Sequence, residues 1–139
     1  MGTVRCPTDR EGRTVPDFIA DCRARVGFDL LANTWNGVLL WALRDGPCRP
    51  YALRRRVGGI SPKVLNETLR RLEAHGLVAH RRYREAPPRV EYELTALGRT
   101  LLGPLEAVGD WAAEHGDAVV AAREQERERA RGGRLRREG

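Results

Sequence analysis

The chain has 139 residues, is 41% hydrophobic and carries a formal net charge of +6. This length suits one domain with a single core, and the apolar content excludes a chain that is disordered throughout. The longest apolar run, residues 38–43, is far too short to span a membrane, and residues 1–13 lack the apolar core of a secretory signal. The sequence therefore predicts a cytoplasmic protein that has no membrane partner.

The predicted elements follow a polar N-terminal arm, residues 1–15, which we expect to be flexible. Helical spacing predicts a first helix from Pro16, on the apolar residues Phe18, Ile19, Cys22 and Val26. The stretch TWNGVLLWALRDG, residues 34–46, is apolar nearly all round, which is typical of a helix inside a core. Asn33 is its expected N-cap.

Two further helices follow in the sequence. PYALRRRVGG, residues 50–59, predicts a short helix that ends at the two glycines. We expect its apolar residues to face inward: Tyr51, Leu53 and Val57. Ser61 is then a good N-cap with Pro62 at the first helical position. The helix that follows has Leu65, Leu69 and Leu72 on one face, and Gly76 is its expected C-terminal glycine.

A hairpin and a last helix complete the predicted fold. LVAHRRYR and RVEYELT, residues 77–84 and 89–95, alternate as strands do around an EAPP tip. Thr95 is an expected N-cap for a long helix, which Pro104 should kink or locally open. We predict one mainly α domain with a small β-hairpin (α+β) at residues 16–121, followed by a charged, disordered tail at residues 122–139.

The two helices joined by VGGIS are a helix-turn-helix candidate. The second helix of such a unit lies in the major groove of DNA, and Lys, Arg, Asn and Glu are side chains that read base edges there. Ser61 and the helix N-terminus suit a phosphate. The predicted contacts on this helix are Ser61, Lys63, Asn66, Glu67 and Arg70. An ordinary solvent-facing helix carries similar residues, so this helix alone leaves both interpretations open.

The distribution of charge favours the DNA interpretation. Residues 49–89 hold ten Arg and one Lys against three Glu, a net charge of +8 within a chain of +6. Such a segment is typical of a polyanion-binding surface, whereas a solvated face usually mixes both signs. In the hairpin, Arg84 and Arg89 are predicted to reach DNA, with Arg89 the more important. Glu85 is expected to pair with a nearby arginine or to point away.

From about Cys22 to Trp111 the sequence resembles the HxlR-type transcription regulators, winged-helix proteins close to the MarR group. The resemblance lies in LRDGPCRPYALRRRVGGISPKVLNETLRRLEAHGLV, YREAPPRVEYELTALGRTLLGPL and the DW at 110–111. Thr34, Pro50 and Asn66 depart from the family pattern and bear on the operator sequence. The resemblance implies dimerisation helices at both ends and a homodimeric repressor on a pseudo-palindromic double-stranded operator.

Two further sets of residues carry hypotheses with alternatives. The predicted dimer interface comprises Phe18, Ile19, Leu105, Val108 and Trp111, although each could instead belong to the core. Some HxlR-type regulators sense oxidants, quinones or aldehydes through a cysteine that matches Cys22. Neighbouring arginines favour the Cys22 thiolate, and Cys6 or, less readily, Cys48 could be its disulfide partner. A buried cysteine that merely packs is the alternative.

Other function classes find little support in the sequence. The cysteines and histidines lack the spacing of a metal site, and no phosphate loop or nucleophile motif is present, so we expect no cofactor and no enzymatic activity. Two alternatives remain: a winged-helix module that binds protein or RNA, and a regulator that responds to no effector.

Overall fold

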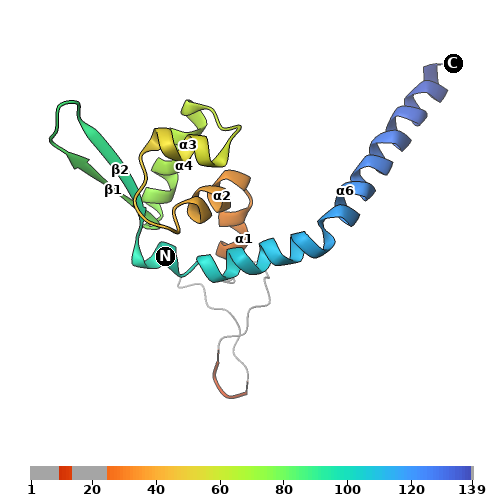
Figure 1. Cartoon of the computed structure of the whole chain (residues 1–139). Coiled ribbons are helices and arrows are strands. Elements are labelled where there is room, and N and C mark those ends of the chain that lie inside the picture. Colours follow the sequence, from red (N-terminus) through yellow and green to blue (C-terminus); the bar gives the residue numbers. More distant parts are fainter. Residues whose placement is uncertain (1–9, 14–24, 139) are drawn as a thin grey trace, which may run out of the picture. The chain divides into compact units, whose positions relative to one another are not determined.

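The fold combines helices with one hairpin, as Figure 1 shows for the computed structural model, which describes residues 10–13 and 25–138. The elements are α1 (Arg25–Leu31), α2 (Thr34–Ala42), α3 (Pro50–Val57), α4 (Pro62–Ala74), β1 (Val78–Tyr83), β2 (Arg89–Leu94), α5 (Ala96–Arg99) and α6 (Leu102–Glu138). The chain divides into two compact units, residues 1–99 and 100–139. The predicted fold class is confirmed. Most of the predicted N-terminal helix and arm lies outside the described residues.

The core of the first unit is built from leucines of α2, α3 and α4. Leu39, Leu43, Leu53, Leu69 and Leu72 are completely buried, and Ile60, Leu65 and Leu94 are nearly so. The predicted apolar faces of α2 and α4 are therefore confirmed. The prediction for Tyr51 is wrong, because its side chain is 70% exposed and only Leu53 of α3 is fully buried.

Local capping sets the bounds of these helices. The Asn33 side chain accepts a hydrogen bond from the backbone N–H of Trp35 at 2.9 Å, and Ser61 accepts one from Val64 at 3.2 Å. Each bond satisfies an N–H that has no partner inside its helix. Gly76 follows α4 with φ 75°, a left-handed conformation that glycine adopts without strain.

Strands β1 and β2 form an antiparallel pair in which Val78 faces Leu94 and Tyr83 faces Arg89. Val78 and Leu94 are buried at the base of the hairpin, while residues 84–88 form its exposed tip. On its other side β2 is held by Cys48, which exchanges backbone hydrogen bonds with Tyr92 at 2.8 and 2.9 Å. In Figure 1 the hairpin extends away from the α2–α4 cluster, so its tip is free to contact another molecule.

The last predicted helix is divided into α5 and α6. Thr95 caps α5 by accepting from the backbone N–H of Gly98 at 3.0 Å. Pro104 lies in the first turn of α6, where its missing N–H costs nothing. If the helix continued backwards, the proline ring would clash with the carbonyl of Thr100, four residues earlier. The local opening of the helix predicted at Pro104 therefore lies just before this proline, between α5 and α6.

The described chain continues as helix to Glu138. This differs from the disordered tail predicted for residues 122–139. The physical reason is that Arg, Glu, Gln and Ala are good helix formers, and opposite charges three residues apart, such as Glu124 and Arg127, stabilise a helix without any core. In the described part of the chain, no helix has the length and apolar character needed to cross a membrane.

Candidate DNA-binding surface

The turn between α3 and α4 depends on two consecutive glycines. Gly58 and Gly59 have φ of 66° and 74°, a conformation that side chains with a Cβ disfavour. Ile60 then enters the core, and the Arg54 side chain donates from Nε to the Ile60 carbonyl at 3.1 Å. These contacts fix the direction in which α4 leaves the turn.

Helix α4 has one buried and one exposed face. Leu65, Leu69 and Leu72 anchor it to the core, together with the buried Thr68. The predicted DNA contacts are all exposed and lie at helical spacing on the opposite side: Ser61, Lys63, Asn66, Glu67 and Arg70. The structure thus brings together these five residues, on a helix whose orientation is fixed by burial.

A hollow of about 510 Å³ lies beside the N-terminus of α4. Tyr51, Arg55 and the glycine turn are among the residues that line it. The Arg55 guanidinium lies 5.9 Å from the centre of the Tyr51 ring, so both side chains are held at the surface. The apolar character of Tyr51 predicts a core position, so the sequence did not reveal this pair. The spacing of four residues between an aromatic ring and an arginine was the available signal.

The arginines of the basic segment fall into two groups. Several bond within the protein: Arg54 to Ile60, Arg56 to the Ala42 carbonyl, Arg71 to Asn36 and Arg81 to Glu93. By contrast, within the described residues no side-chain hydrogen bond or ion pair holds Lys63, Arg70, Arg82 or Arg84. The side chains of the second group keep their full hydrogen-bonding capacity for another molecule.

Arg89 is held inside the hairpin. Its guanidinium stacks on Tyr83 with 4.1 Å between the guanidinium carbon and the ring centre. Its nitrogens lie 3.4 Å from a Glu85 carboxylate oxygen and 3.5 Å from a Glu91 carboxylate oxygen. The predicted pairing of Glu85 with an arginine is confirmed. Its partner is Arg89, the residue that the sequence predicts to reach DNA. Arg84, by contrast, is exposed and unpaired among the described residues.

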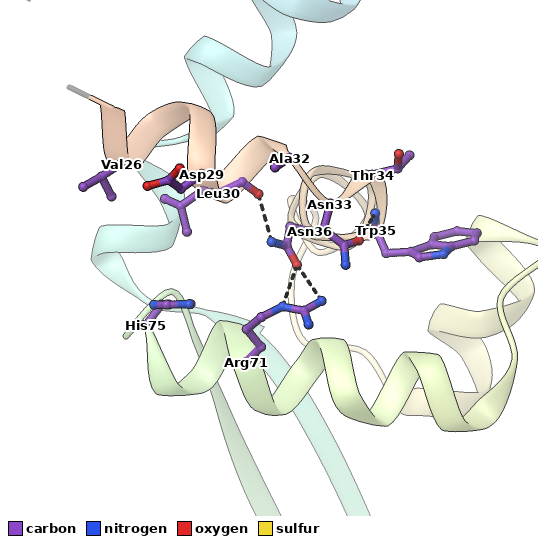
Figure 2. Close-up of a pocket in the computed structure, with 10 residues that line it drawn as sticks. All are labelled: Val26, Asp29, Leu30, Ala32, Asn33, Thr34, Trp35, Asn36, Arg71 and His75. Atoms are coloured by element: carbon purple, nitrogen blue, oxygen red, sulfur yellow. Dashed lines mark hydrogen bonds between the residues drawn. The ribbon is translucent and has the colours of Figure 1, made fainter. Parts of the chain in front are cut away.

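A buried polar network joins α1, α2 and α4, as Figure 2 shows. Asn36 donates to the Leu30 carbonyl at 2.9 Å and accepts from Nη2 of Arg71 at 3.2 Å. The same Arg71 nitrogen lies 3.5 Å from the hydroxyl of Thr68. Asn36 is only 4% exposed, so these bonds offset the cost of burying its amide. A lone Asn in the apolar α2 was the sequence signal for this network.

The network borders a pocket of about 800 Å³ between α1, the start of α2 and the end of α4. Asp29, Trp35, Arg71 and His75 are among its lining residues. The pocket therefore offers both charges and an aromatic face. Across the described part of the chain, no cluster of His, Cys, Asp or Glu could hold a metal ion.

The sequence model of the HxlR-like helix-turn-helix proteins matches residues 30–120, which include the whole of α2 to α5. The chain belongs to the HxlR-like family. The HTH-type transcriptional regulator YkvN of Bacillus subtilis is 36% identical over 105 residues, covering 76% of this chain and 89% of YkvN.

Solved structures show the same similarity. The chain is 37% identical to the regulator ytfH of Salmonella typhimurium, with a TM-score of 0.65 over 78% of this chain and 97% of that one. It is 34% identical to the redox regulator HypR in its oxidized form, with a TM-score of 0.63 over 67% of this chain and 96% of that one. This HxlR-like protein is therefore a transcriptional regulator with a winged helix-turn-helix, and it is not an enzyme.

The remaining predicted sites of this HxlR-like regulator are only partly described. Cys6, Phe18, Ile19 and Cys22 lie outside the described residues. Cys48 is buried, and its thiol lies 3.6 Å from the Arg49 carbonyl oxygen. On α6, Leu105 is half-buried and Val108 and Trp111 are more than half exposed, with the Trp111 ring centre 5.3 Å from that of His115.

Proposed function

We propose that this HxlR-like regulator binds a pseudo-palindromic duplex operator as a homodimer and represses transcription from it. The observation that carries the proposal is the exposed polar face of α4, whose orientation is set by leucines that are almost completely buried. A helix held in this way inserts into the major groove without reorganising. Sequence recognition then requires little ordering of the protein.

Base recognition is assigned to the exposed face of α4. Lys63 and Arg70 suit the two acceptors of guanine, Asn66 suits adenine, and Glu67 suits the amino group of cytosine. Ser61 remains a proposed phosphate contact at the start of the helix, although its hydroxyl already accepts from Val64. The charged side chains of this face are exposed, so they lose little internal bonding when DNA binds.

The hairpin is assigned to the DNA backbone or minor groove. Arg84 is the proposed contact, because it is exposed at the tip and has no partner among the described residues. Arg89 is proposed to act on DNA chiefly through the hairpin, by holding Glu85 away from phosphate. Tyr51 and Arg55 on α3 are added as phosphate contacts, since the first helix of a helix-turn-helix crosses the backbone.

Dimerisation is assigned to α6 together with the helix that the sequence predicts around Phe18 and Ile19. Trp111 and Val108 are more than half exposed in the single chain, and large exposed apolar groups on one helix favour association. Leu105 extends the same stripe. Two recognition helices about one DNA turn (~34 Å) apart read a longer site than one can.

Redox control is assigned to Cys22, supported by the similarity to the redox regulator HypR. A peroxide is the proposed oxidant. Two thiols would give up two protons and two electrons and form a disulfide. The O–O bond of the peroxide would break, and hydrogen peroxide would be reduced to two water molecules. Cys6 is the proposed partner, since the Cys48 thiol is buried. Quinones and aldehydes are alternative effectors that would add to the same thiolate.

Footprinting on the DNA that flanks the gene of this protein tests the proposal. We expect a protected two-fold site, with affinity at least about a thousandfold above random duplex, and weaker protection after treatment with hydrogen peroxide. Equal affinity for all duplexes would contradict operator recognition and favour a protein- or RNA-binding module. Release by peroxide that is unchanged in Cys22→Ser would exclude Cys22 as the sensor.

A further inference from the structure

The C-terminal part of α6 carries a row of arginines on one face. Residues 123–137 hold seven Arg and three Glu, and they lie beyond the matched family region at residues 30–120. Five of these arginines follow one another at steps of four, four, three and three residues: Arg123, Arg127, Arg131, Arg134 and Arg137. With 3.6 residues per turn, these steps place all five within an arc of about 120°. We call these five residues the arginine row.

The glutamates flank the row and offset only part of its charge, as in the pair Glu124 and Arg127, three residues apart. Glu124, Glu126 and Glu128 fall outside the arc of about 120° that the arginines occupy, as the helical spacing of 3.6 residues per turn requires. All five arginines are exposed, and none has a side-chain hydrogen bond or ion pair with another described residue. The row is therefore a continuous basic strip more than three turns long.

Helix stability accounts for only part of the row, because three glutamates at residues 124–128 face five arginines. Like charges four residues apart, as in Arg123, Arg127 and Arg131, destabilise an isolated helix. Cations favour the C-terminus of a helix only within its last turn, which leaves all but Arg137 of the row unexplained. Gly132 and Gly133 weaken the same stretch further. A partner that carries regularly spaced negative charge would remove the repulsion between the arginines.

Most of the row lies away from the proposed dimer seam. One shallow groove along α6 is lined by Trp111, His115, Ala118, Val119 and Ala122, and its edge includes Glu126 and Arg123, the first member of the row. From the helical spacing, that groove is centred roughly 100° around the helix from the row. A partner helix on the groove would therefore leave most of the arginine row open to solvent.

We propose that the arginine row binds the phosphate backbone of double-stranded DNA independently of base sequence. DNA is favoured over other polyanions because a second DNA-directed element on the same chain holds the duplex nearby, which raises its effective concentration. A duplex presents one negative charge per about 1.7 Å of its axis, so it can neutralise the whole row at once. The row would add affinity to any duplex, whereas α4 selects the operator.

The test uses the full chain and two double variants with the same change of charge. Arg127→Gln with Arg131→Gln removes two members of the row, and Arg129→Gln with Arg136→Gln removes two arginines from the far side of the helix. Binding to a random duplex of about 30 base pairs, long enough for two half-sites, is followed by fluorescence anisotropy across a salt series. Circular dichroism confirms that α6 stays helical in both variants.

We expect the slope of log affinity against log salt to fall by about 2 per protomer for the row variant, or about 4 for a bound dimer, because each arginine removed from a phosphate lowers the slope by about one. The far-side variant should keep the slope of the unaltered chain. Equal slopes for the two variants, or no change in the row variant, would overturn the proposal. A weaker affinity for a duplex RNA of the same length, with unchanged affinity for DNA, would also overturn it and identify RNA as the partner.

The test of the arginine row and the test of operator recognition by α4 can fail independently of each other. The row variant should weaken operator and random duplex by the same factor, leaving their ratio unchanged, because phosphate contacts carry no base information. Another outcome is a chain that shows no preference for an operator while the salt slope still falls in the row variant. That result would contradict the proposed function and leave this inference standing. A changed operator-to-random ratio in the row variant would overturn the inference.

Discussion

Arg89 and Tyr83 face each other across the hairpin, and the Arg89 guanidinium lies over the Tyr83 ring at 4.1 Å. The stack fixes the guanidinium next to Glu85 and Glu91, so the charge of Arg89 is offset within the hairpin. An arginine in this position stabilises the shape of the hairpin. The neighbouring Arg84, which is exposed, is left to carry the positive charge of the tip.

This difference predicts opposite effects for two arginine substitutions in the hairpin. Arg84→Gln should lower the salt slope of DNA binding by about one per protomer and leave the thermal midpoint unchanged. Arg89→Gln should lower the free energy of unfolding by about 1 kcal/mol, since a stacked and partly exposed ion pair contributes that order. Anisotropy and thermal melts measure the two effects. A stable Arg89→Gln chain with the larger loss of DNA affinity would restore the order expected from the sequence.

Asn66 on α4 predicts a change in specificity. Asn66→Ala should reduce the preference for one adenine of the operator by about 1–3 kcal/mol, the range for a bidentate base contact. Affinity for random duplex should stay the same, since the amide is neutral and exposed. Competition between operators altered at single positions measures the preference. If every altered operator loses affinity equally, Asn66 makes no base contact.

The Asn36–Arg71 pair predicts a measurable coupling. Asn36→Ala should cost about 1–3 kcal/mol of stability, because the Leu30 carbonyl and the Arg71 guanidinium each lose a partner. A double-mutant cycle with Arg71→Met should give a coupling of at least about 0.5 kcal/mol, as expected for residues in contact. Urea denaturation provides all four free energies. Additive effects would show that the network contributes nothing as a unit.

Gly98 predicts the strongest local effect on folding. A Cβ at this position would lie 2.1 Å from the Leu77 carbonyl oxygen, so backbone must move. Gly98→Ala should destabilise the first unit by about 1–3 kcal/mol, the usual cost of overpacking. Gly132→Ala is the matched control, because nothing lies within 4 Å of its Cβ and alanine favours a helix. Similar stability of both variants in thermal melts would contradict the close approach of α5 to Leu77.

The exposed apolar residues of α6 predict an effect on association. Trp111→Glu should convert the homodimer to monomer at micromolar concentration, since burying an unpaired carboxylate in an apolar interface is costly. Val120→Glu is the control, because nine residues of helix place Val120 on the side opposite Trp111. Light scattering after size exclusion gives the masses. Dissociation in both variants, or in neither, would remove Trp111 from the interface.

The amino-acid sequence by itself determined the local structure of this protein. Ser61, Asn33 and Gly76 mark helix ends because capping depends on residues only a few positions away. The leucine spacing of α4 and the alternation of β2 likewise follow from periods of 3.6 and 2. The exposed face of α4 follows once its buried face is known, so the candidate recognition residues could be predicted too.

Only the tertiary structure decided which of the many arginines remain available. Arg71 meets Asn36 from 35 positions away, and Arg89 meets Tyr83 across a turn. Tyr51 lies at an apolar position of α3 but faces solvent, because Leu53 alone reaches the core. Periodicity places a side chain on a face of its own element, whereas its partners depend on how separate elements pack. The contacts that hold Arg89 inside the hairpin, and the burial of Cys48 beside β2, therefore required the folded chain.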